Sequence, residues 1–181
     1  ENLEALEKEL YASGSDRATA VLFASFVETS LQRLLVSLMR PDLNSNETKQ
    51  IFGFDGALSS FSSMINLGYA LNVLGPITRN DLVIIKFVRN EFAHSRMPFD
   101  FKTPELGEVC SHLEIIDQLG ATAPMGYLDL APQEELEAAM DITNPKTRFI
   151  ATCHHIAYRI SVKRDGPKEG DSVFPNDEPL P

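Results

Sequence analysis

The sequence of 181 residues has no tryptophan, only two cysteines and no long hydrophobic run. A helix that crosses a bilayer needs roughly 20 mostly apolar residues in succession. The apolar runs here are far shorter, so we expect no membrane partner.

Cys110 and Cys153 lie among apolar neighbours, which is typical of reduced, buried thiols in a cytoplasmic protein. A single disulfide between them is the alternative. The chain begins at Glu1 rather than at a methionine, which leaves a removed leader open, and it shows no signal-peptide pattern.

Basic residues are also scarce. Sixteen lysines and arginines stand against 26 aspartates and glutamates, which gives a net charge of −10. Ten of the acidic residues and a single basic one, Lys102, lie between Asp100 and Asp141. Tight binding of duplex DNA depends on many contacts between basic side chains and phosphates. The composition therefore argues against direct binding of duplex DNA, whereas a protein surface or a small RNA site stays compatible with it.

The sequence has no convincing strand-like alternation, whereas apolar residues three and four positions apart recur along most of it. Ala24, Val27, Leu31 and Leu34, for example, share one face of a long helix. This spacing predicts an all-α, single-domain bundle of about five to seven helices. The expected helices span residues 17–40, 57–74, 78–95, 103–119, 134–140 and 145–162, with a loop at 42–55.

Composition divides the chain into three parts. Residues 1–16 form an acidic N-terminal helix and linker, residues 17–163 form the helical bundle domain, and residues 164–181 form a tail rich in proline, glycine and charge. The tail has too few apolar residues to build a core by itself. We therefore expect it to dock on the bundle or on a neighbouring subunit.

The stretch from Ile85 to Ser95 brings together the residue types that bind a phosphate and transfer a proton. Asn90 and His94 are four residues apart and share a helix face, where an amide–imidazole hydrogen bond is natural. Arg89 and His94 are five apart, about 140° around the axis at roughly 100° per residue. They converge on one phosphate only if the helix frays near His94, or if two copies meet across a symmetry axis.

Two interpretations of these residues follow. In a catalytic dimer Arg89 would hold the scissile phosphate, and His94 would be the general acid or base, since histidine titrates near neutrality. Asn90 would orient the imidazole or contact the phosphate. In the structural interpretation, Arg89 and Asn90 cap carbonyls or pair with an acid such as Glu28, and His94 interacts with the dipole of the helix end. Composition alone favours the structural interpretation.

No cofactor and no metal site is expected. Cys153, His154 and His155 are consecutive, so on a helix their side chains diverge by about 100° from one residue to the next and chelate a metal poorly. Cys110 and His112 would have to join them in space to complete a zinc site. We do not favour that arrangement.

Two segments, Asp55 to Leu71 and Arg89 to Ser95, resemble the mannitol operon repressor (MtlR-like) family in content and order. The long helix around Phe26 and the segment Thr147 to Ile150 fit the same pattern, so the resemblance covers roughly residues 17 to 160. It implies an all-helical fold and a cytoplasmic bacterial regulator of transcription. It brings no DNA-binding motif, and the sequence contains no helix-turn-helix with a basic recognition helix. Regulation would then act through a partner protein.

The Arg-Asn-x3-His spacing also resembles the HEPN superfamily, whose active members are metal-independent, toxin-like endoribonucleases with an active site at a dimer interface. Carried over to this chain, the resemblance makes Arg89 the phosphate-binding residue, His94 the proton-transferring residue and Asn90 the supporting polar residue. RNA would be the substrate.

Taken together, the residues and the resemblances favour a non-enzymatic, cytoplasmic regulator that forms a homodimer or higher homo-oligomer and contacts a protein partner. The alternative is a metal-independent ribonuclease in which Arg89 and His94 are catalytic. A small-molecule sensor stays open as a third class, although no particular residue points to it.

Overall fold

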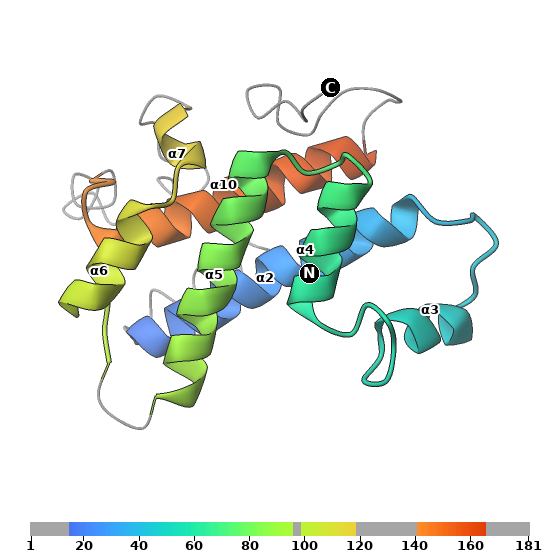
Figure 1. The fold of residues 1–181 in the computed structure, drawn as a ribbon, viewed down its shortest axis with the longest axis horizontal. Helices are drawn as coiled ribbons and strands as arrows, with labels where there is room; N and C mark the ends of the chain where they lie inside the picture. Colours follow the sequence, from blue (N-terminus) through green and yellow to red (C-terminus); the bar gives the residue numbers. More distant parts are fainter. Residues whose placement is uncertain (1–14, 96–98, 119–140, 166–181) are drawn as a thin grey trace.

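The computed structural model describes residues 15–95, 99–118 and 141–165 (Figure 1). Within these ranges the chain forms seven helices and no strand, so the expected all-α bundle is confirmed. The expected helix before residue 15, the expected helix at 134–140 and the tail from residue 166 lie outside the described residues. The helices are α2 (Asp16–Ser37), α3 (Ser45–Phe52), α4 (Phe61–Ala70), α5 (Pro76–His94), α6 (Pro104–Ser111), α7 (Ile115–Gln118) and α10 (Pro145–Asp165).

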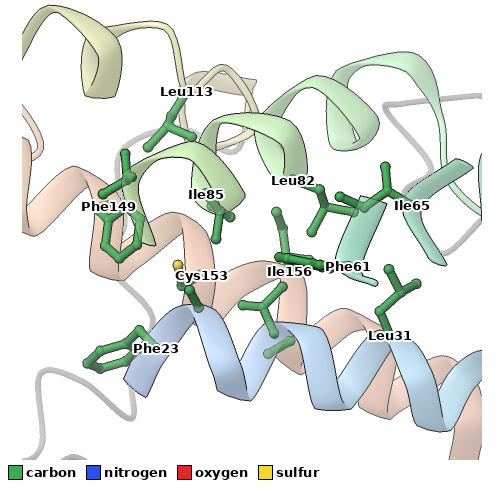
Figure 2. Packing of buried hydrophobic residues seen from close by; sticks show 14 of the residues in the cluster. Phe23, Leu31, Phe61, Ile65, Leu82, Ile85, Leu113, Phe149, Cys153 and Ile156 are labelled. Atoms are coloured by element: carbon green, nitrogen blue, oxygen red, sulfur yellow. The ribbon is translucent and has the colours of Figure 1, made fainter. Parts of the chain in front are cut away.

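The helices pack in two layers. Figure 1 shows α4 and α5 side by side on the near side of a second layer formed by α2 and α10. Helices α6 and α7 pack beside α10 and α5. One core lies between the layers (Figure 2), and burying each large apolar side chain in it stabilises the fold by roughly 1.5–3 kcal/mol. It includes Phe23 and Leu31 from α2, Phe61 and Ile65 from α4, Leu82 and Ile85 from α5, and Phe149, Cys153 and Ile156 from α10.

The long helix expected at residues 17–40 is present as α2. It begins where the Ser15 side chain accepts a hydrogen bond from the backbone N–H of Ala18, an N-cap that satisfies one free donor of the first turn. Among the described helices, α2 alone is long and apolar enough by composition to cross a membrane, and half of its apolar window is buried inside the bundle. Its apolar residues therefore serve as core.

The prediction of a loop at residues 42–55 was wrong in part, because α3 occupies the middle of it. The Asn44 side chain accepts hydrogen bonds from the backbone N–H groups of Asn46 and Glu47. The Glu47 carboxylate in turn accepts from the backbone N–H of Asn44 at 2.9 Å. This reciprocal pair is a capping box, which satisfies two otherwise unpaired donors and stabilises a short helix.

The helix expected at residues 57–74 is shorter than predicted. It starts at Phe61, because Ser60 and Ser63 form a second capping box that fixes the first turn there. It ends at Ala70, where the carbonyl of Gly68 in the last turn accepts the N–H groups of Val73 and Leu74 at 3.0 and 3.2 Å. Asn72 completes the turn with φ = 60°, the left-handed region that asparagine tolerates better than most residues.

The single helix expected at residues 103–119 is in fact two helices, α6 and α7, separated by a turn. The Asp81 carboxylate, from α5, accepts the backbone N–H groups of Glu114 and Ile115, both at 2.9 Å. These donors lie at the start of α7, where backbone N–H groups have no partner within the helix. A side chain from a distant helix therefore caps α7 and separates it from α6.

Candidate functional site

The Arg-Asn-x3-His motif lies in the second half of α5, and a buried stripe sets the orientation of this helix. The ring of Phe92 packs against those of Phe99 and Phe101, with centroid separations of 5.2 and 4.9 Å. This anchoring fixes the directions in which the motif side chains point. The buried stripe consists of Leu82, Ile85, Val88 and Phe92, all 0% exposed.

Arg89 points toward α2 and forms an ion pair with Glu28, with 3.1 Å between Arg89 Nη2 and Glu28 Oε2. The two side chains are only 27% and 25% exposed. Burial raises the pKa of Glu28 above its usual value, and the positive charge of Arg89 opposes this shift. The pairing with Glu28, one of the arrangements expected under the structural interpretation, is present.

Asn90 and His94 lie on the side of α5 that faces away from the core, Asn90 partly buried and His94 exposed. No hydrogen bond joins these two described side chains, so the expected amide–imidazole contact is not formed. The helix is regular through His94, with the Ser95 N–H donating to the Glu91 carbonyl at 3.0 Å. The fraying that would let Arg89 and His94 converge within one chain is therefore absent.

Arg17 adds a second cation beside the motif. Its Nη2 donates to the backbone carbonyl of Ser95 at 2.6 Å. The carbonyls at the end of a helix carry a partial negative charge, and a cation there stabilises the helix. Arg17 thus ties the start of α2 to the end of α5, immediately after His94.

Asp81 is a buried polar residue that the sequence analysis did not single out. It is 0% exposed, and burial raises the pKa of its carboxyl group to about 6, even though the two backbone hydrogen bonds lower it. Its position offered a signal. Residue 81 is four before Ile85 and three after Thr78, two other buried residues of α5. An acidic residue on a buried stripe indicates a carboxylate with a specific partner.

Arg148, on α10, holds the segment that Asp81 caps. Its Nη2 donates to the Leu113 carbonyl at 2.5 Å and also pairs with the Asp117 carboxylate. The positive charge of Arg148 favours the ionised form of Asp81, although the effect is smaller than that of burial. Together Asp81 and Arg148 fix α7 from two sides, a structural role.

The two cysteines are free thiols and both are fully buried. Burial raises the pKa of Cys110 to about 12 and that of Cys153 well above its usual value, so neither forms a reactive thiolate readily. Burial also lowers the pKa of His154, and that of His155 to about 4. In the ranges that the structure describes, no group of three His, Cys, Asp or Glu residues is placed to hold a metal ion.

A surface cleft of about 470 Å³ lies where the start of α2 meets the N-terminal ends of α6 and α10. Asp16 occupies its wall: one carboxylate oxygen is 2.7 Å from Lys146 Nζ, and the other accepts the Phe101 N–H at 3.0 Å. The carboxylate of Asp16 therefore already takes the place that an anion would take beside Lys146. None of the Arg-Asn-x3-His residues lines this cleft.

Comparison with known proteins gives no match to this chain among family models, curated proteins or solved structures. A functional conclusion therefore rests on the side chains themselves. The direction of the Arg89 side chain, which points to α2 and away from His94, is the feature that bears most on the function.

Proposed function

We propose that this protein is a cytoplasmic, non-enzymatic regulator of transcription that acts through contacts with a partner protein, as its MtlR-like resemblance implies. The observation behind the proposal is the ion pair between Arg89 and Glu28. A phosphate-binding arginine has to be available to the phosphate, whereas this one is partly buried and already bound to a carboxylate. His94 is exposed and lies on the outer side of α5, away from Arg89.

An exposed aromatic residue supports a role in protein contact. Phe54 is 98% exposed and lies in the turn between α3 and α4. The turn is held by hydrogen bonds from the Gly56 N–H to the Gly53 carbonyl and from the Leu58 N–H to the Ile51 carbonyl, at 2.8 and 2.9 Å. A Cβ atom at Gly56 would lie 2.1 Å from the Ile51 carbonyl oxygen, so only glycine fits. A rigid turn that displays an aromatic side chain is well suited to fill a pocket on a partner protein.

The regulatory proposal is tested by comparing transcripts in cells that express the wild type, Phe54→Asp or Tyr158→Asp at equal levels. Tyr158 is the matched control, since it is an aromatic residue on α10 with 60% exposure. We expect the wild type and Tyr158→Asp to change the same transcripts and Phe54→Asp to lose the effect. If the amounts of all transcripts are the same in cells with and without the wild-type protein, the regulatory function is refuted. Unchanged regulation by Phe54→Asp would refute the contact through this turn.

The ribonuclease remains the second candidate, because the Arg89 side chain keeps 27% of its surface exposed and is not sealed from solvent. In this proposal RNA is cut without a metal, and Arg89 has to leave Glu28 to bind the phosphate. Glu28→Gln would then release Arg89 and raise activity, whereas Arg89→Ala and His94→Ala would abolish it.

The two candidates are separated by incubating single-stranded RNA with the purified protein in EDTA. We expect the wild type and Glu28→Gln to leave the RNA intact. Cleavage that increases in Glu28→Gln and disappears in both alanine variants would establish the ribonuclease and overturn the regulator.

A further inference from the structure

Helix α5 has a second stripe of side chains on the face opposite its buried one. Val83 and Phe87 are 44% and 45% exposed, although both are apolar and lie in the middle part of the helix. The stripe comprises Asn80, Val83, Phe87, Asn90 and His94, and we call it the outer α5 stripe. Its spacing of three, four, three and four residues is the a/d spacing of a helix that packs against another helix.

The charges beside the outer α5 stripe are arranged asymmetrically. Lys86 lies on the flank next to α4, where its Nζ donates to the Ser62 hydroxyl oxygen at 2.8 Å. Glu91, which is exposed, is five residues further on and about 140° around the helix axis, on the other flank. A basic and an acidic residue with this spacing occupy the g and e positions of a heptad, which pair between two parallel helices.

We propose that a second copy of this chain packs on the outer α5 stripe, with the two α5 helices parallel about a two-fold axis. Phe87 then meets the partner's Phe87 at the centre of the seam, and Lys86 faces the partner's Glu91, twice by symmetry. An antiparallel arrangement would instead bring Lys86 close to the partner's Lys86. The two charges therefore favour a second copy of the chain on the outer α5 stripe and a parallel direction of its helix. Lys86 faces an opposite charge on the second copy only when the two α5 helices are parallel.

Polar residues within the stripe fit this arrangement. Asn80 and Asn90 each occupy an a or d position, and in parallel pairs a polar residue there fixes the register at some loss of stability. In that register His94 meets the partner's His94. Arg89 points toward α2 in both copies and is therefore kept out of the seam.

The association is measured first with the full-length protein, by sedimentation over concentrations from about 1 to 100 µM. We expect a reversible dimer in which Phe87→Glu raises the dissociation constant about a hundredfold, because two aromatic rings leave the seam and two carboxylates replace them. Tyr158→Glu, on the exposed surface of α10, is the matched control and should leave the constant unchanged. A wild type that stays monomeric overturns the proposal. This holds even if Phe87→Glu has a lower melting temperature than the wild type, because that result would mean that residues of the same chain cover the outer α5 stripe.

A charge exchange provides variants that keep the helix surface polar and do not depend on Phe87. Lys86→Glu and Glu91→Lys should each weaken the dimer roughly tenfold, since each creates two like-charge pairs across the seam. The double variant Lys86→Glu/Glu91→Lys should restore the wild-type constant to within about twofold. If the double variant dimerises no more tightly than the single variants, the pairing of Lys86 with the partner's Glu91 is refuted.

Cross-linking tests the direction of the helices. The two natural cysteines are buried, so a single cysteine placed at the end of the stripe supplies the thiol. Under mild oxidation we expect Asn80→Cys alone and His94→Cys alone to give a dimer that a reductant separates, and Tyr158→Cys to give none. Cross-linking only in a mixture of Asn80→Cys and His94→Cys would show antiparallel helices and overturn the proposed arrangement.

Discussion

Replacing Asp81 with asparagine changes how the stability of the protein depends on pH. The Asp81 carboxyl group is fully buried and has a pKa of about 6, against a usual value of 3.8. Because the pKa is raised in the folded state, the protonated form of Asp81 favours folding. Its contribution is fully present below pH 3.8 and is lost as the pH rises through about 6.

The size of this effect follows from the two pKa values. The whole shift corresponds to about 3 kcal/mol of unfolding free energy. About half of it, roughly 1.4 kcal/mol, is lost between pH 5 and pH 8, because at pH 5 an unfolded aspartate is already ionised. In Asp81→Asn the group no longer titrates, so this part of the pH dependence disappears.

His154 is buried and His155 is partly buried, and their titration requires that the wild type and the variant be compared at each pH. Burial lowers the pKa of His154, and that of His155 to about 4, so their neutral forms favour folding and stability rises with pH as they lose their protons. This trend is opposite in sign to that of Asp81. It is common to the wild type and Asp81→Asn, so it cancels in the difference between their unfolding free energies.

The assay is denaturant unfolding followed by circular dichroism at pH 5, 6.5 and 8. We expect the stability of the wild type minus that of Asp81→Asn to fall by about 1.4 kcal/mol from pH 5 to pH 8. Asp55→Asn, at an exposed position in the turn after α3, is the control for removing a carboxyl group at the surface. A constant difference between the wild type and Asp81→Asn would refute the reasoning, and a difference that grows with pH would reverse its sign.

Four further predictions concern the packing and the backbone. Gly68→Ala should destabilise the protein by about 1–3 kcal/mol in denaturant unfolding, because the new Cβ would lie 2.7 Å from the Leu74 side chain. Gly107→Ala, inside α6 with ordinary contacts, should instead stabilise it by about 0.5–1 kcal/mol. Asn72→Ala should lower the stability by about 1 kcal/mol, because alanine tolerates a φ of 60° poorly. Both thiols should react with Ellman's reagent only after unfolding, and fast reaction of the native protein would contradict their burial.

Local patterns in the sequence were enough to predict most of the helices. The three- and four-residue spacing predicted α2 and α5 to within three residues at each end. Helix α3 was missed although its signal is local, since Asn44 and Glu47 have the spacing of a capping box. The break between α6 and α7 had no local signal, because it depends on Asp81 from another helix.

The candidate site was predictable to a similar degree. Helical periodicity alone separated Arg89 from His94 and placed Asn90 beside His94. The sequence named Glu28 as a possible partner of Arg89, but the choice depends on how α2 packs on α5, 61 residues away along the chain. The absence of a hydrogen bond between Asn90 and His94 likewise depends on side-chain orientations that helix geometry does not fix.

The energy of the Arg89–Glu28 pair does not by itself decide between a regulator and a ribonuclease. A partly exposed ion pair contributes up to about 1 kcal/mol, and a phosphate bound by two charged hydrogen bonds would offset that loss. The direction of Arg89 matters more, because its guanidinium group contacts Glu28 on α2 and residues 89 and 94 lie about 140° apart around the helix axis. Arg89 and His94 can meet only if a second copy brings them together. Self cross-linking of His94→Cys would place two His94 side chains at the seam and both Arg89 side chains beyond it, which removes the geometry that the ribonuclease requires.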